Sequence, residues 1–230
     1  MTSVAVVRSF EVAVFAIFAL CIVGLLRQRK PLYLGAFLAG GVCFVFDWTW
    51  CARSFFNATF HPDLIPIPGM TTQGLSYPLS LPPAWALAFG LTTVLLVKAG
   101  PWLDRRFGLF GYVLVWVGAS AVNMAAENFL VGVLQIYTYH QKPEFLCGVV
   151  PWSNLLLTGN LQLLCYAGLR CMQRWSGLPD RVEFSLGSEA TWKGLVMGAM
   201  PIWAAFVLAY AVQLFWYGSA DPWIESGRPF

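Results

Sequence analysis

Long apolar runs dominate this sequence of 230 residues. An α-helix of about 20 apolar residues spans the hydrocarbon core of a bilayer, and six runs approach that length: residues 4–26, 31–53, 81–98, 110–135, 148–170 and 191–218. None shows the alternation over about ten residues that is typical of a membrane barrel. Charged residues are only 11% of the chain, against roughly 25% in soluble domains. We therefore predict an all-α fold, a polytopic membrane helix bundle with about six transmembrane helices, in one domain over residues 1–230.

The distribution of lysine and arginine predicts how the bundle is oriented. The loops expected on one side hold Arg27, Arg29, Lys30, Lys98, Arg105, Arg106, Arg170, Arg174, Arg181 and Lys193, whereas the other side holds only Arg8, Arg53, Lys142 and Arg228. By the positive-inside rule the first side faces the cytoplasm. We predict a multi-pass protein of the cell membrane with both termini outside. No basic cluster is large enough to predict binding to nucleic acid.

The cysteines and histidines do not form a zinc motif. The chain has six cysteines and two histidines, and no two cysteines form a CxxC pair. A structural zinc site is therefore not expected. Cys51 and Cys147 both lie near predicted outer helix ends, and whether they pair is open, because a disulfide needs close and aligned Cβ atoms.

Three acidic residues lie within the predicted spans, where a charged side chain is costly and therefore a functional candidate. Glu11 is near the start of the first span and close to Arg8, which favours a structural ion pair at the helix end. Asp47 and Glu127 lie deeper. We therefore expect Asp47 and Glu127 to be the functional acids.

Polar side chains form a stripe on each of two predicted helices. Residues three or four apart share one face of a helix, as do Ser120, Asn123 and Glu127 in the fourth span. The fifth span repeats the pattern with Asn154, Thr158 and Gln162. Because such stripes do not face lipid, we expect the two to face each other or a polar cavity, which Asp47 could share.

Aromatic residues gather at the same predicted depth: Trp48, Trp50, Tyr137, Tyr139, His140 and Trp152. An interfacial aromatic belt would explain the tryptophans, but it would not explain the acids. A carboxyl group in an apolar cavity tends to keep its proton and can act as a general acid, and aromatic faces stabilise cations. These residues suit acid-catalysed chemistry on a lipophilic substrate, and equally a small proton-linked carrier.

Common catalytic motifs are absent from the sequence. It contains no GxSxG, P-loop, dinucleotide fingerprint or HExxH motif, and no aspartate-rich motif of the kind by which soluble terpene synthases bind magnesium. We expect a metal-independent mechanism without a cofactor.

Scattered motifs resemble the AveC-type spirocyclase family of actinobacterial membrane proteins. They are Phe46-Asp47-Trp48, Phe55-Phe56-Asn57, His61-Pro62-Asp63-Leu64, Asn123-Met124-Ala125-Ala126-Glu127, Ile136-Tyr137-Thr138-Tyr139 and Phe145 to Trp152. The Glu followed by Tyr-x-Tyr also looks like membrane carotenoid hydratases and related small cyclases. One departure is that the fifth helix of the family carries a further Glu, whereas residues 151–158 here contain no acid.

The resemblance implies a membrane-bound enzyme that cyclises, hydrates or dehydrates a lipophilic polyketide- or isoprenoid-like small molecule. Asp47 and Glu127 would transfer protons, and the substrate would be oriented by Trp48, Trp50, Asn57, Asn123, Tyr137, Tyr139, Trp152 and Asn154. Two alternatives stay open. One is a non-enzymatic carrier or lipid-binding protein with proton-relay carboxylates, and the other is a structural membrane subunit.

Overall fold

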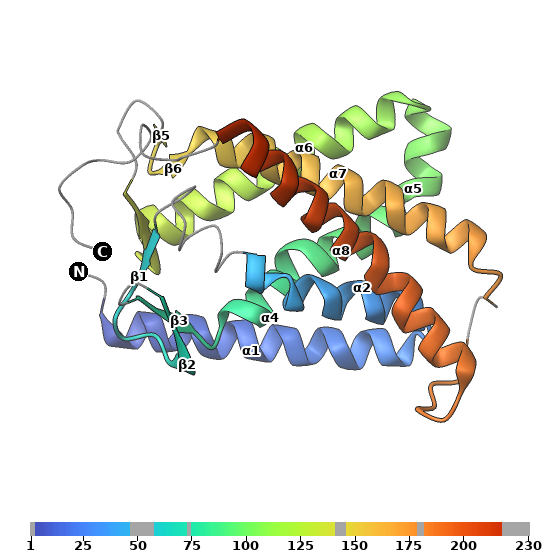
Figure 1. Cartoon of the computed structure of the whole chain (residues 1–230), viewed down its shortest axis with the longest axis horizontal. Coiled ribbons are helices and arrows are strands. Elements are labelled where there is room, and N and C mark those ends of the chain that lie inside the picture. Colours follow the sequence, from blue (N-terminus) through green and yellow to red (C-terminus); the bar gives the residue numbers. More distant parts are fainter. Residues whose placement is uncertain (1–2, 47–57, 73–74, 141–145, 179–181, 218–230) are drawn as a thin grey trace.

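The computed structural model describes residues 3–46, 58–72, 75–140, 146–178 and 182–217 (Figure 1). Six helical segments make up most of this part of the chain. In chain order they are α1 (Val4–Arg27), α2 (Pro31–Val42), the continuous stretch α4 (Leu81–Trp85), η1 (Ala86–Leu91) and α5 (Thr92–Phe107), then α6 (Phe110–Asn128) with η2 (Phe129–Val133), α7 (Trp152–Trp175) and α8 (Glu189–Tyr217). The predicted all-α bundle is confirmed.

Four helical stretches are long and apolar enough to cross a membrane: Val4–Arg27, Leu81–Phe107, Phe110–Val133 and Glu189–Val212. Large apolar side chains cover their outer faces, as at Val12 and Leu20 of α1, which are 68% and 71% exposed. A soluble surface rarely carries so much contiguous apolar area, so these faces suit contact with lipid.

The other two predicted spans differ from this description. Residues 31–53 are described only to Phe46, as a shorter apolar helix over Pro31–Phe46. The span predicted at 148–170 is α7, which is 24 residues long but is not among the four apolar stretches. Asn154, Asn160, Gln162 and Arg170 interrupt its apolar sequence. All of them except the exposed Asn160 are buried in the bundle.

Helix α2 lies at the centre of the bundle, and ten of its 12 residues are buried. Glycines bring it against α8 at backbone distance. A Cβ atom on Gly35 would overlap the carbonyl of Leu195, and one on Gly198 would overlap the carbonyl of Leu32. A Cβ on Gly194 would likewise overlap Pro31, so these small residues let the two helix backbones meet.

The opposite side of α2 packs as closely against η1. Gly40 and Gly90 face each other there, and a Cβ on either would overlap backbone atoms of the other helix. Both η1 and η2 are π-helical, a conformation that usually adds one residue to a helical turn and is frequent at functional sites. Each follows an α-helical turn without interrupting the helix.

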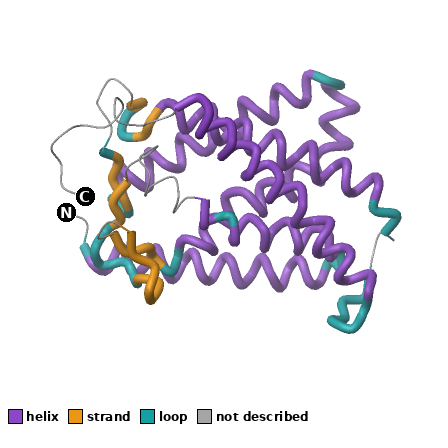
Figure 2. Tube along the Cα trace, in the orientation of Figure 1, coloured by secondary structure: helices purple, strands orange, loops and turns teal. Residues whose placement is uncertain are grey.

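Short antiparallel strand pairs cover one end of the bundle, as Figure 2 shows. Strand β1 (Ala58–Phe60) pairs with β4 (Tyr137–Tyr139), β2 (Pro66–Thr72) with β3 (Leu75–Pro78), and β5 (Leu146–Cys147) with β6 (Val150–Pro151). The opposite end holds the connections from α1 to α2, α5 to α6 and α7 to α8 (Figure 1). The described part of the segment that leads to α4, residues 58–72 and 75–80, is therefore folded, and it is called here the cap.

The glycine packing makes a direct prediction about stability. Gly198→Ala should lower the free energy of unfolding by about 1–3 kcal/mol, because the added methyl group overpacks the contact with α2. Gly24→Ala in α1 is the matched control, since nothing lies within 4 Å of a Cβ there and alanine favours helix. Thermal unfolding in detergent measures both. Equal midpoints for the two variants would contradict the role given to the α2–α8 contact.

Candidate functional site

A cavity of about 190 Å³ lies inside the bundle near the strand-covered end. Its wall is mostly apolar and aromatic, with Phe10, Phe60, Trp85, Phe89, Leu130, Ile136, Leu157 and Leu161. The polar groups of the wall are Ser80, Asn123, Glu127, Tyr137, Tyr139, Asn154 and Thr158. A mainly apolar cavity with a few convergent polar groups is typical of a small-molecule site.

Glu127 is the only acidic side chain among the described residues of the cavity wall. The phenol of Tyr139 donates a hydrogen bond to its Oε2 over 2.6 Å. The amide of Asn123 approaches Oε1 at 3.4 Å. Tyr137 and Asn154 also hydrogen-bond to the carboxyl group, so Glu127 is held at the cavity wall by several polar side chains.

The contacts of Glu127 belong to a closed ring of hydrogen bonds. The side-chain amide of Asn154 donates to the Tyr139 hydroxyl at 3.4 Å. The Thr158 hydroxyl donates to the side-chain carbonyl of Asn154 at 3.5 Å. Asn123 then donates to the Thr158 hydroxyl at 3.1 Å. The ring joins α6, α7 and β4, so it fixes the carboxyl group from three separate elements.

The two polar stripes meet because α6 and α7 approach closely. Ser120 of α6 donates to the backbone carbonyl of Leu155 of α7 at 3.0 Å, and a Cβ on Gly159 would overlap the Ser120 hydroxyl. The predicted facing of the stripes is confirmed by these contacts. The stripe on α7 also turns toward α5, since Gln162 donates to Thr93 at 2.7 Å.

Five of the predicted site residues line this one cavity: Asn123, Glu127, Tyr137, Tyr139 and Asn154. Their roles in binding or catalysis stay predictions. Asp47, Trp48, Trp50 and Asn57 lie outside the described residues, as does Cys51 with its candidate partnership to Cys147. Trp152 begins α7, but its side chain lies outside the described part.

Several wall residues were not predicted. Trp85 and Phe89 come from the end of α4 and from η1, and Phe60 and Ser80 come from the cap. Trp85 and Phe89 have ring centroids 5.0 Å apart. In the sequence, both residues belong to an ordinary apolar span. A π-helical turn produces no repeating spacing of residues, so the sequence could not show that they line a cavity.

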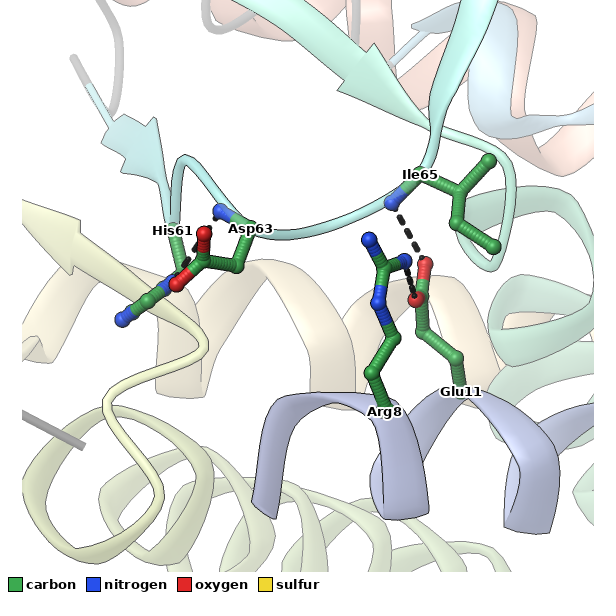
Figure 3. Close-up of polar contacts among 5 residues, drawn as sticks. All are labelled: Arg8, Glu11, His61, Asp63 and Ile65. Carbon is green, nitrogen blue, oxygen red and sulfur yellow. Dashed lines mark hydrogen bonds and ion pairs between the residues drawn. The ribbon is translucent and has the colours of Figure 1, made fainter. Parts of the chain in front are cut away.

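Glu11 has a structural role that agrees with its predicted ion pair. Arg8 Nη1 lies 2.7 Å from Glu11 Oε2, and the backbone amide of Ile65 donates to Oε1 at 2.8 Å. Figure 3 shows both groups reaching Glu11 between α1 and the loop after β1. Glu11 is only 2% exposed. Its hydrogen bond with Ile65 links α1 to the cap, and this link is called here the Glu11 clasp.

A second charged cluster lies toward the other end of α7. Arg170 donates to both carboxylate oxygens of Asp104 in α5 and to the hydroxyl of Tyr166 at 2.9 Å. This bidentate pair ties α5 to α7 and satisfies a nearly buried guanidinium group. Within the described part of the chain, no three His, Cys, Asp or Glu side chains lie close enough to hold a metal ion.

Comparison of the chain with protein families, curated proteins and solved structures finds no match.

The hydrogen-bond ring can be tested by a double-mutant cycle on stability. Glu127→Gln and Tyr139→Phe should show an interaction energy of about 0.5–3 kcal/mol in thermal unfolding, as expected for side chains in direct contact. Tyr139→Phe combined with Gln173→Ala is the control, because Gln173 follows Asn154 in α7 by about 28 Å of helix. Additive effects in the first pair would mean that the 2.6 Å contact contributes nothing.

Proposed function

We propose that this chain is a membrane-embedded enzyme that cyclises, hydrates or dehydrates a lipophilic polyketide- or isoprenoid-derived substrate by proton transfer. Glu127 is the acid/base group. The observation that carries the proposal is its carboxyl group, set in an apolar and aromatic cavity and held by Tyr139 and Asn123. A fixed carboxyl group of this kind supplies general acid–base catalysis.

The two oxygens of Glu127 have different tasks in this mechanism. The short bond from Tyr139 orients Oε2. Oε1, with its long contact to Asn123, gives a proton to a double bond or an oxygen atom of the substrate. The resulting cation is attacked by a hydroxyl group or a second double bond of the same molecule, which closes the ring. The proton that this step releases returns to Glu127, so the reaction is redox-neutral and the enzyme is regenerated.

The aromatic wall supports such a cationic step. Trp85, Phe89 and Phe60 line the same cavity as Glu127, and an aromatic face attracts a cation by about 0.5–2 kcal/mol. In a cyclisation, the apolar surroundings also keep bulk water from capturing the cation before the ring closes. The segments 123–127 and 137–139 resemble AveC-type spirocyclases. This resemblance points to the same class of reaction.

The proposal places the chain in the cell membrane, with several spans and both termini outside. The cytoplasmic end would be the one with the α1–α2, α5–α6 and α7–α8 connections. Arg29 and Lys30 belong to the first of these connections, and Arg105 and Arg106 lie next to the second. The strand-covered end, next to the cavity, would then face outward, and a lipophilic substrate would reach it from the membrane.

Reporter fusions test this orientation. Fusions after Lys30, Arg105 and Arg174 should all report a cytoplasmic location, because positive residues are retained on that side. A fusion within the cap, after Ser76, should report the outside. An outward signal at any of the first three sites would overturn the topology.

Turnover of a Glu127→Gln variant tests the chemistry. The amide keeps the shape of the side chain but cannot exchange a proton, so turnover should fall by about 10²–10⁴-fold while the protein remains folded. Glu189→Gln, at an exposed carboxyl group in the first turn of α8, is the matched control and should keep full activity. Asp47→Asn tests the second predicted acid in the same way.

The assay uses purified membranes, a linear lipophilic precursor and mass spectrometry of the products. Full turnover in Glu127→Gln would refute the assigned role. A wild-type protein that retains the precursor and never converts it would instead be a carrier.

A further inference from the structure

A second and larger pocket, of about 590 Å³, adjoins the cavity. Phe60, Tyr137 and Tyr139 line both spaces. The larger space, called here the outer pocket, is also lined by Thr59, His61 and Thr138. Nothing in the proposed mechanism uses these three polar side chains.

The ribbon formed by β1 and β4 is the wall between the two spaces. Ala58 pairs with Tyr139, Thr59 with Thr138 and Phe60 with Tyr137. Successive side chains of a strand point to opposite faces. The first and third pairs therefore line the cavity with Glu127, whereas the threonine pair lines only the outer pocket. One face of the ribbon is apolar and aromatic, and the other carries hydroxyl groups.

His61 continues the ribbon and is fixed in place. Its backbone amide donates to the carbonyl of Ile136 at 2.8 Å, and its side chain is only 8% exposed. The backbone amide of Asp63 donates to His61 Nδ1 at 3.3 Å, a contact visible in Figure 3. The carboxylate oxygen Oδ2 of Asp63 also lies 3.6 Å from Nδ1. When Nδ1 accepts from the backbone amide, the neutral imidazole carries its proton on Nε2. His61 thus brings a held N–H donor to the outer pocket.

We propose that the outer pocket binds the polar end of the substrate, a neutral hydroxyl or carbonyl group, while the apolar part that reacts lies beside Glu127. This inference rests on the proposed function and names its substrate class, an amphipathic lipid alcohol or ketone. His61 Nε2–H and the Thr138 hydroxyl are the recognition groups. An imidazole N–H and a hydroxyl group can both donate a hydrogen bond to a neutral oxygen atom.

Two histidine substitutions separate binding from a merely structural role. Asparagine places its amide near Nδ1, so His61→Asn can keep the contact with Asp63 but lacks the Nε2 donor. Glutamine reaches the Nε2 position, so His61→Gln keeps the donor and loses the loop contact. Thr138→Val removes the second recognition group. Thr92→Val, outside both spaces, is its control.

The probes are farnesol and the matching hydrocarbon farnesene, and the measurement is equilibrium binding of each to the full chain in nanodiscs. His61→Asn should weaken farnesol binding about 3- to 10-fold, the effect of one hydrogen bond, and leave farnesene binding unchanged. His61→Gln should restore farnesol binding. Thr138→Val should show a loss specific to farnesol, and Thr92→Val none.

Each other outcome contradicts the inference. Equal weakening of both probes by His61→Asn would make His61 a structural residue, and unchanged farnesol binding in both His61→Asn and Thr138→Val would remove the polar subsite. If the wild type binds neither probe, the outer site is refuted. The catalytic proposal is judged separately by turnover of Glu127→Gln, which leaves the outer pocket intact.

Discussion

The close packing of α2 against α8 on one side and η1 on the other is the contact on which the rest of the bundle depends. Lipid chains are as apolar as leucine side chains, so helices inside a membrane associate mainly by tight packing. Gly35, Gly198, Gly40 and Gly90 provide it by removing the Cβ atoms that would hold the backbones apart. With α2 buried at the centre, α1 and α6 keep wide apolar faces for lipid.

The hydrogen-bond ring around Glu127 is the second constraint, because it places polar groups inside a bundle that is held together mainly by apolar packing. Polar groups inside an apolar bundle cost free energy unless they are hydrogen-bonded. Here Asn123, Tyr139, Asn154 and Thr158 satisfy one another and the carboxyl group. A network of this kind holds its members in one arrangement, which is also what a proton-transferring group needs.

The cap lies next to the cavity at one end of the bundle. Glu11 clasps the loop at Ile65, and the β1–β4 ribbon presents aromatic side chains inward and hydroxyl groups outward. A two-stranded ribbon is marginal by itself in water, so its position depends on this clasp and on the packing of Val7, Leu64 and Ile136. The same few strands thereby separate the cavity with Glu127 from an outer pocket that the two threonine hydroxyl groups line.

The sequence alone determined the helices and half of the site, because both depend on local periodicity. Apolar runs marked the helices, and spacings of three and four residues placed Asn123, Glu127, Asn154 and Thr158 on facing stripes. Tertiary structure alone decided that Trp85 and Phe89 of the α4–η1 stretch complete the wall, that Tyr139 donates to Glu127, and that His61 borders a second pocket. These contacts join residues far apart in the chain, or arise from π-helical turns and very short strands. Neither leaves a repeating pattern in the sequence, so only the packed bundle could fix them.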